Sequence, residues 1–138
     1  MTRFRDEQGF ATVEAAFYVP VVVLILLAIV AGGRLVEADA DVHAAARDAA
    51  RAASLRGTTG GATVAAHDAV EGALARRRRS CAEWTAQVET GEFRPGGLVT
   101  VNVVCAVPLS DLGLPGVPAT RSVHATVSVP IDPLAVRP

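Results

Sequence analysis

Hydrophobic residues dominate one uninterrupted stretch near the N-terminus. From Ala15 to Ala31 no side chain is charged or strongly polar, and residues 10–13 extend the apolar run upstream, with Glu14 as its only acid. At about 1.5 Å per residue, residues 10–33 are long enough to cross a hydrocarbon core about 30 Å thick. The pattern predicts a transmembrane helix in which Pro20 introduces a kink, with a helix buried in a protein core as the alternative.

The pattern changes after Gly32 and Gly33, which we expect to form a flexible point where the helix leaves the membrane. Small and apolar residues then recur on one helical face while charged residues occupy the remainder, which predicts an amphipathic continuation to about Leu55. This face is mostly alanine, so it either allows close approach of a partner helix or covers the protein's own sheet. Its members are Leu35, Ala38, Val42, Ala46, Ala49 and Ala53.

A second helix is predicted after a turn at residues 57–61. Thr63 is a candidate for its N-terminal cap, and an apolar stripe between Ala66 and Leu74 gives it a packing face. Four arginines end the helix, where cations suit the negative end of the helix dipole. The same side chains are also candidates for a weak contact with anions, such as lipid headgroups or wall polymers. They are Arg76, Arg77, Arg78 and Arg79.

From Cys81 onward the hydrophobic period shortens to two. Apolar residues alternate with polar ones over 99–107 and over 122–129, which predicts two strands with one buried face each, and residues 83–90 are expected to supply a third. We expect these strands to pair antiparallel, with the second helix packed on them. The connection at residues 108–118 is rich in Pro and Gly yet carries Leu and Val, so it either folds over the sheet or contacts a partner.

Together these patterns predict an α+β protein. A long N-terminal transmembrane helix continues into an amphipathic helix, and a second helix and a small antiparallel sheet of about three strands follow. The expected division is a cytoplasmic leader at residues 1–9, a transmembrane helix at 10–33, an exported helical segment at 34–80 and an exported sheet region at 81–138.

The charges that flank the apolar run predict its orientation. Arg3 and Arg5 precede the run, whereas the acids Glu37 and Asp39 soon follow it. The positive-inside rule then places the N-terminus in the cytoplasm and the C-terminal domain outside, in a protein that crosses the cell membrane once. A secretory signal peptide removed after Gly33 is the alternative, although the run exceeds the usual apolar region of about 7 to 15 residues.

Composition and side-chain chemistry argue against an enzyme. A net charge of -1 gives no preference for nucleic acid. The chain has no nucleophile elbow, phosphate-binding glycine loop or zinc-protease helix, so neither a cofactor nor a small-molecule substrate is expected. Asp39 and Asp41 start like a calcium loop, but the loop glycine is missing, and no metal site is expected.

Cys81 and Cys105 are the only cysteines. The predicted orientation puts both in an oxidising compartment, where a disulfide between them is the natural interpretation. Closing a loop of this length is worth about 3 kcal/mol by the chain-entropy estimate. Two cysteines without nearby histidines are only a weak zinc signal.

The most informative stretch is the start of the apolar run, where Gly9 precedes Phe10 and an acid, Glu14, lies five positions after the glycine. A carboxylate at the centre of a bilayer costs about 2.5 to 3.5 kcal/mol, and less near the interface, so an acid here indicates a function with a partner to be named. The alternative is that Glu14 merely extends to the lipid headgroups.

This stretch resembles the leader of type IV pilins and pseudopilins, and residues 3–34 resemble the N-terminus of TadE-type pseudopilins of the tight-adherence pilus machinery. Residues 96–101 and 122–130 are also similar to that family's C-terminal strands. The resemblance implies that a prepilin peptidase cuts between Gly9 and Phe10. It also implies that Glu14 of an incoming subunit neutralises the new amino group inside a helical bundle.

The resemblance implies a minor pseudopilin that works with other pilin or pseudopilin subunits and with the pilus assembly machinery. Major pilins of this machinery tend to have an aromatic residue directly after the Glu, whereas this chain has Ala15, which favours a minor subunit. The alternative is an unprocessed, signal-anchored module that binds envelope partners and has no pilus role, because related TadG-like proteins share the anchor and can stay uncut.

Overall fold

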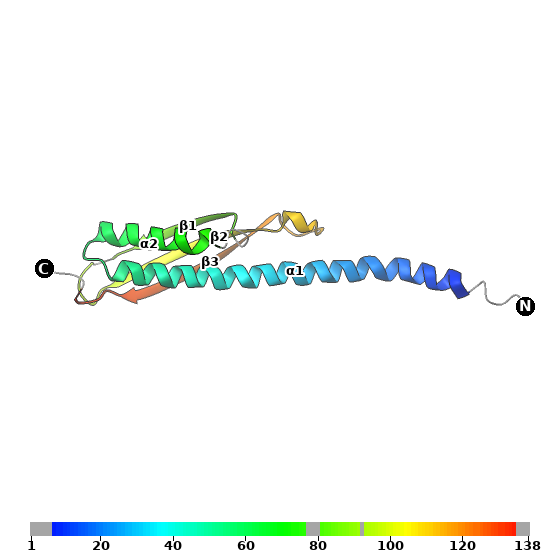
Figure 1. The fold of residues 1–138 in the computed structure, drawn as a ribbon, viewed down its shortest axis with the longest axis horizontal. Helices are drawn as coiled ribbons and strands as arrows, with labels where there is room; N and C mark the ends of the chain where they lie inside the picture. The colour runs from blue at the N-terminus through cyan, green and yellow to red at the C-terminus, as the bar shows by residue number, and fades with distance from the viewer. Residues whose placement is uncertain (1–6, 77–80, 92, 135–138) are drawn as a thin grey trace, which may run out of the picture.

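The computed structural model describes residues 7–76, 81–91 and 93–134. Helix α1 (Glu7–Ser54) is followed by α2 (Thr59–Ala75), strand β1 (Glu83–Glu89), strand β2 (Leu98–Pro108), a short 3-10 helix η1 (Ser110–Leu112) and strand β3 (Thr120–Pro130). Figure 1 shows α1 as the long axis of the molecule, with all other elements beside its C-terminal half. The predicted α+β class is confirmed.

Helix α1 is one continuous element of 48 residues. It runs through Pro20 and through Gly32 and Gly33 without a break in its helical assignment. The chain thus continues as helix across the two glycines, and a flexible point there stays a prediction. Glycine costs a helix about 1 kcal/mol per residue, and the packing of Ala31 and Leu35 against the rest of the protein on either side offsets that cost.

Helix α2 begins earlier than the sequence predicted, and its cap is Thr58 rather than Thr63. The Thr58 backbone is extended, and its side-chain oxygen accepts a hydrogen bond from the Gly61 amide at 3.1 Å. Thr63 lies inside the helix, where its hydroxyl donates to the Thr59 carbonyl at 3.0 Å. The residue that can leave the helical conformation and satisfy a free amide of the first turn becomes the cap.

The three strands form one antiparallel sheet in the order β1-β2-β3. In the register, Trp84 of β1 lies opposite Cys105 of β2, and Val103 of β2 lies opposite Ala125 of β3. The predicted alternation along β2 is confirmed, because every second side chain is buried. The buried residues of this strand are Val99, Val101, Val103, Cys105 and Val107.

The core lies between the sheet and the C-terminal half of α1. Helix α1 packs against β2 and β3 and also against α2, whereas the few contacts of α2 with the sheet are chiefly with β1. The expectation that the second helix packs on the strands was wrong, since the alanine face of α1 takes that place (Figure 1). Alanine lets the helix backbone approach closely on two sides. Its fully buried members include Ala38, Ala45, Ala46, Ala49, Ala50 and Ala53.

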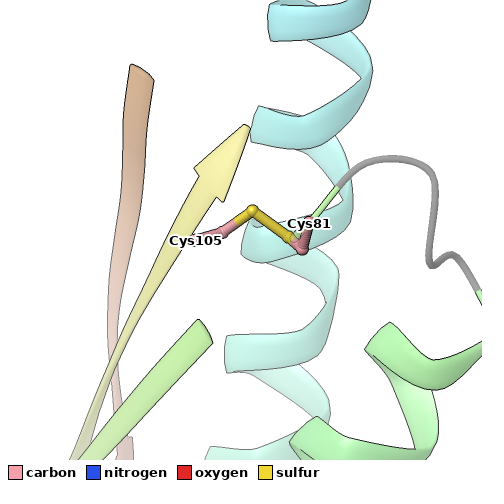
Figure 2. The surroundings of a disulfide bond; sticks show 2 residues. All are labelled: Cys81 and Cys105. Atoms are coloured by element: carbon pink, nitrogen blue, oxygen red, sulfur yellow. A yellow bond between two sulfur atoms is a disulfide. The ribbon is translucent and has the colours of Figure 1, made fainter. Parts of the chain in front are cut away.

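A disulfide ties the residues just before β1 to the central strand. Cys81 and Cys105 are joined with their Cα atoms 5.5 Å apart, and the bond lies beside α1 (Figure 2). The Ala82 amide donates to the Ala106 carbonyl at 2.9 Å and so extends the pairing of β1 with β2 up to the bond. The disulfide therefore fixes the start of an edge strand.

We expect Ala49→Leu to destabilise the exported domain by about 1 to 3 kcal/mol, because a larger side chain on the alanine face forces α1 away from its neighbours. The measurement is denaturant unfolding of the full chain in detergent, followed by near-ultraviolet circular dichroism of Trp84. Ala40→Leu is the matched control, since Ala40 lies on the exposed side of the same helix. Equal stabilities of the two variants would contradict the packing described above.

Replacing both cysteines, as Cys81→Ser with Cys105→Ser, should lower the free energy of unfolding by about 3 kcal/mol, because the open chain gains entropy when it unfolds. The same unfolding experiment measures it, and reduction of the unsubstituted protein with dithiothreitol provides the control without substitutions. An unchanged denaturation midpoint in both samples would show that the bond contributes nothing to stability.

Candidate functional site

Residues 13–30 of α1 form an apolar stretch of helix that the described part of the protein leaves almost entirely exposed. The large hydrophobic side chains between Val13 and Val30 are exposed, Phe17 most of all at 74%, and only Leu27 is half-buried. The helix is long and apolar enough to span a membrane once, and its most apolar 18-residue window is only 6% buried. A core helix would be covered by the rest of its own protein, so the core-helix alternative does not apply.

Glu14 lies near the N-terminal end of this exposed segment. Its neighbours one turn further along the helix are Phe17 and Tyr18, and both are exposed. Within the described ranges the Glu14 carboxylate has neither a hydrogen bond nor an ion pair. The acid and its aromatic neighbours thus form a patch that another molecule can reach.

Glu14 and Arg34 mark the two ends of the apolar segment. They are 20 positions apart in one helix, which corresponds to about 30 Å along the axis and matches the thickness of a hydrocarbon core. In a membrane that this segment spans, Glu14 would therefore lie near one boundary and not at the centre. At this depth a carboxylate costs less than it does at the bilayer midplane.

The predicted processing site lies at the start of α1. Gly9 and Phe10 fall in the first turns of the helix, which begins at Glu7. Residues at a helix end unwind readily because their backbone groups are only partly paired. A peptidase can therefore gain access to this peptide bond at little energetic cost. The leader residues up to Asp6, Arg3 and Arg5 among them, lie outside the described residues.

The other end of the segment carries an ion pair that the sequence did not reveal. Arg34 Nη1 donates to both carboxylate oxygens of Asp111, each at 2.8 Å. Asp111 belongs to η1 in the β2–β3 connection, 77 residues away in the chain. Both side chains are partly exposed, so the pair stabilises the fold by at most about 1 kcal/mol, but it fixes the position of the connection.

The predicted anion contact has only one described member. Arg76 donates through Nε to the Gly72 carbonyl at 2.9 Å, and Arg77, Arg78 and Arg79 lie outside the described residues. Beside Arg76 is a shallow hollow of about 250 Å³ that Asp41 and Asp48 also line. Two carboxylates disfavour an anion there. Asp41, which the pattern placed on the polar side of the helix, is buried because α2 covers that side of α1.

Neither the candidate calcium ligands nor the cysteines form a metal site. Asp39 and His43 are neighbours on α1, with His43 Nε2 3.9 Å from Asp39 Oδ1, and both are exposed. In the part of the chain that the structure describes, no three His, Cys, Asp or Glu side chains gather closely enough to hold a metal ion.

A known protein family matches the N-terminal part of the chain. The model of the family described as TadE-like protein matches residues 9–51. The N-terminal segment of this chain is TadE-like. The match begins at Gly9, includes Phe10 and Glu14, and extends over the exposed half of α1 and most of its alanine face. No curated protein and no solved structure matches the chain.

The TadE-like match indicates a protein related to the tight-adherence pilus, associated with a membrane and with pilus components. TadE-like proteins are a structural family of pili and not a family of enzymes. The two strand segments at residues 96–101 and 122–130 lie beyond the match. Their similarity to the family's C-terminal strands stays a prediction.

Proposed function

We propose that this protein is a minor pseudopilin that takes part in assembling a tight-adherence type pilus or a related secretion pseudopilus. Its leader faces the cytoplasm, α1 crosses the membrane once, and α2 and the sheet lie outside the cell membrane. The observation that carries the proposal is the exposed Glu14 carboxylate on a helix whose neighbouring side chains are exposed and apolar. Such a group needs a cationic partner inside a membrane or a filament.

Cleavage between Gly9 and Phe10 supplies that partner. The cut creates an α-amino group at Phe10, which carries a positive charge at neutral pH and lies about 6 Å from Glu14 along the axis, one helical turn away. When a second subunit packs alongside with an offset of one turn, its Glu14 lies level with this amine. Each charge then compensates the desolvation of the other, and subunits that are out of register leave both charges unpaired.

Packing within the exported domain limits which surfaces of α1 can contact other subunits. The alanine face of α1 is occupied by the protein's own sheet and by α2. Contacts with other subunits must therefore use the exposed half of α1 inside the membrane and its opposite face outside, where Val36 and Ala40 are exposed. Ala15, in place of the aromatic residue that major pilins tend to have there, supports a minor subunit.

The alternative is an unprocessed, signal-anchored module that binds envelope partners. The observation that favours it is the position of Glu14 near the end of the apolar segment, from which its side chain can reach the lipid headgroups. In that case the leader is retained, and Glu14 is held near the cytoplasmic headgroups without a partner subunit.

We expect the membrane-extracted protein to lack residues 1–9 in cells that contain the prepilin peptidase and to keep them in cells that do not. Intact-mass measurement and N-terminal sequencing distinguish the two forms. Gly9→Val should block the cut, because a branched side chain replaces the hydrogen atom next to the scissile bond.

Gly33→Val is the control for this experiment, since a Cβ at Gly33 meets no other atom within 4 Å and the residue lies far from the cut. A chain that still begins at Met1 in a piliated cell would rule out the processed pseudopilin and leave the anchored module.

Glu14→Ala should leave membrane insertion intact and reduce the number of pili per cell by about tenfold or more, because the amine of the neighbouring subunit loses its counterion. Glu14→Gln should behave alike, since it keeps the size of the side chain and removes only the charge. Electron microscopy of whole cells counts the pili, and immunoblots of membrane fractions measure how much of the protein is inserted.

Glu37→Ala is the matched control, because it removes an exposed acid from the same helix beyond the apolar segment. Normal piliation with Glu14→Ala, at a normal amount of membrane protein, would disprove the role of Glu14.

A further inference from the structure

The β2–β3 loop, defined here as residues 109–119, lies against α1 where the apolar segment ends. Arg34, three residues after Ala31, holds Asp111 of this loop at 2.8 Å through both carboxylate oxygens. Ala31 is only 8% exposed and belongs to the buried cluster against which Leu112 and Leu114 pack. Figure 1 shows the loop reaching past the end of the sheet, beside α1 and toward its N-terminal half.

Backbone hydrogen bonds give the loop a defined tip. The Leu109 amide donates to the Ala119 carbonyl at 2.7 Å and closes the base of the loop. Further out, the Val117 amide donates to the Leu114 carbonyl at 3.4 Å, with Pro115 and Gly116 between them and Gly116 at φ 79. Proline followed by a glycine of positive φ is typical of a type II turn, so residues 114–117 form a turn of this type.

The tip carries no charge. Residues 112–120 contain neither an acidic nor a basic side chain, and the acid before them, Asp111, is neutralised by Arg34. Residues 115–118 are all exposed, Val117 at 42%. The inner leucines of the loop thus pack on the protein, while Pro115, Val117 and Pro118 face outward.

The level of the tip along α1 identifies what it faces. Arg34 ends a helical segment about 30 Å long that fits a hydrocarbon core, so Arg34 lies among the lipid headgroups when α1 is inserted. Because Asp111 contacts Arg34 directly, the loop lies at the same depth. An uncharged tip with proline and valine side chains at that depth meets the boundary between headgroups and acyl chains.

We propose that the β2–β3 loop is a second membrane contact, in which the tip at residues 115–118 inserts into the surface of the bilayer that α1 spans. The partner is the lipid itself, and the contact continues the apolar surface of α1 beyond its own end. The Arg34–Asp111 pair positions the loop at this depth. Two contacts, one helix and one loop, fix the tilt of the exported domain over the membrane. This contact does not depend on cleavage at Gly9.

Tryptophan fluorescence of the full chain in phosphatidylcholine vesicles tests the proposal. Val117→Trp places the probe at the tip, and Val64→Trp is the matched control. Val64 is an exposed valine in the first half of α2, and α2 begins at the end of the domain farthest from the apolar segment (Figure 1). Trp84 is present in both variants, and its emission in the unsubstituted protein is subtracted.

We expect lipids brominated near the headgroup end of their acyl chains to quench the tryptophan fluorescence of Val117→Trp at least about twice as strongly as that of Val64→Trp. The emission of the tip probe should also be shifted to the blue. Aqueous iodide should show the opposite order. Adding Asp111→Asn should reduce the lipid quenching at position 117 and leave that at position 64 unchanged, because the loop loses its tie to Arg34.

Equal lipid quenching of the two probes would overturn the proposal. So would a tip probe shielded from both iodide and brominated lipid, which would show that protein covers the loop. Unchanged lipid quenching at position 117 with Asp111→Asn would show that the Arg34–Asp111 pair does not position the loop. Pro115 and Gly116 of the turn are unchanged in every variant, and near-ultraviolet circular dichroism verifies the fold of each variant.

Discussion

The structure depends on one helix that serves two environments. The C-terminal half of α1 packs its alanine face against β2, β3 and α2, and this contact makes a small sheet with few aromatic residues stable enough to fold. Toward the N-terminus, residues 13–30 of the same helix are exposed except for the half-buried Leu27, and Glu14 is their only charged residue. The helix continues through Gly32 and Gly33, so the apolar segment and the face that packs on the sheet belong to one element.

The two charged residues at the ends of the apolar segment have different roles that follow from their partners. Arg34 pairs with Asp111 of its own chain, and this pair ties the β2–β3 connection to α1. Glu14 has no such partner among the described residues, and the proposed function assigns its pairing to another subunit. A membrane protein that retains an unpaired acid gains from it only when assembly supplies the opposite charge. The TadE-like match over residues 9–51 includes this acid and stops before α2 and the sheet.

Local pattern was enough to predict the helices, the strand alternation and the class of fold, because the hydrophobic periods along the chain are long and clear. It failed where a choice depended on distant residues. Both helices carry Ala and Val stripes, so nothing local indicates that α1 rather than α2 covers the sheet. Thr58 and Thr63 have equal capping chemistry, and only the fold of the preceding turn separates them. The Arg34–Asp111 pair joins residues 77 positions apart, and burial of Asp41 follows from the placement of α2.

Whether Glu14 meets the amino terminus of another subunit is the central claim, and site-specific photo-crosslinking tests it most directly. Phe17 lies one turn from Glu14 and is highly exposed, so p-benzoylphenylalanine can replace it with little disturbance. Mass spectrometry of crosslinked material from piliated cells should find the probe joined to the first peptide of a second pilin-like subunit, with that peptide beginning at the residue after its cleaved glycine. Crosslinks to lipid alone in such cells would contradict the account.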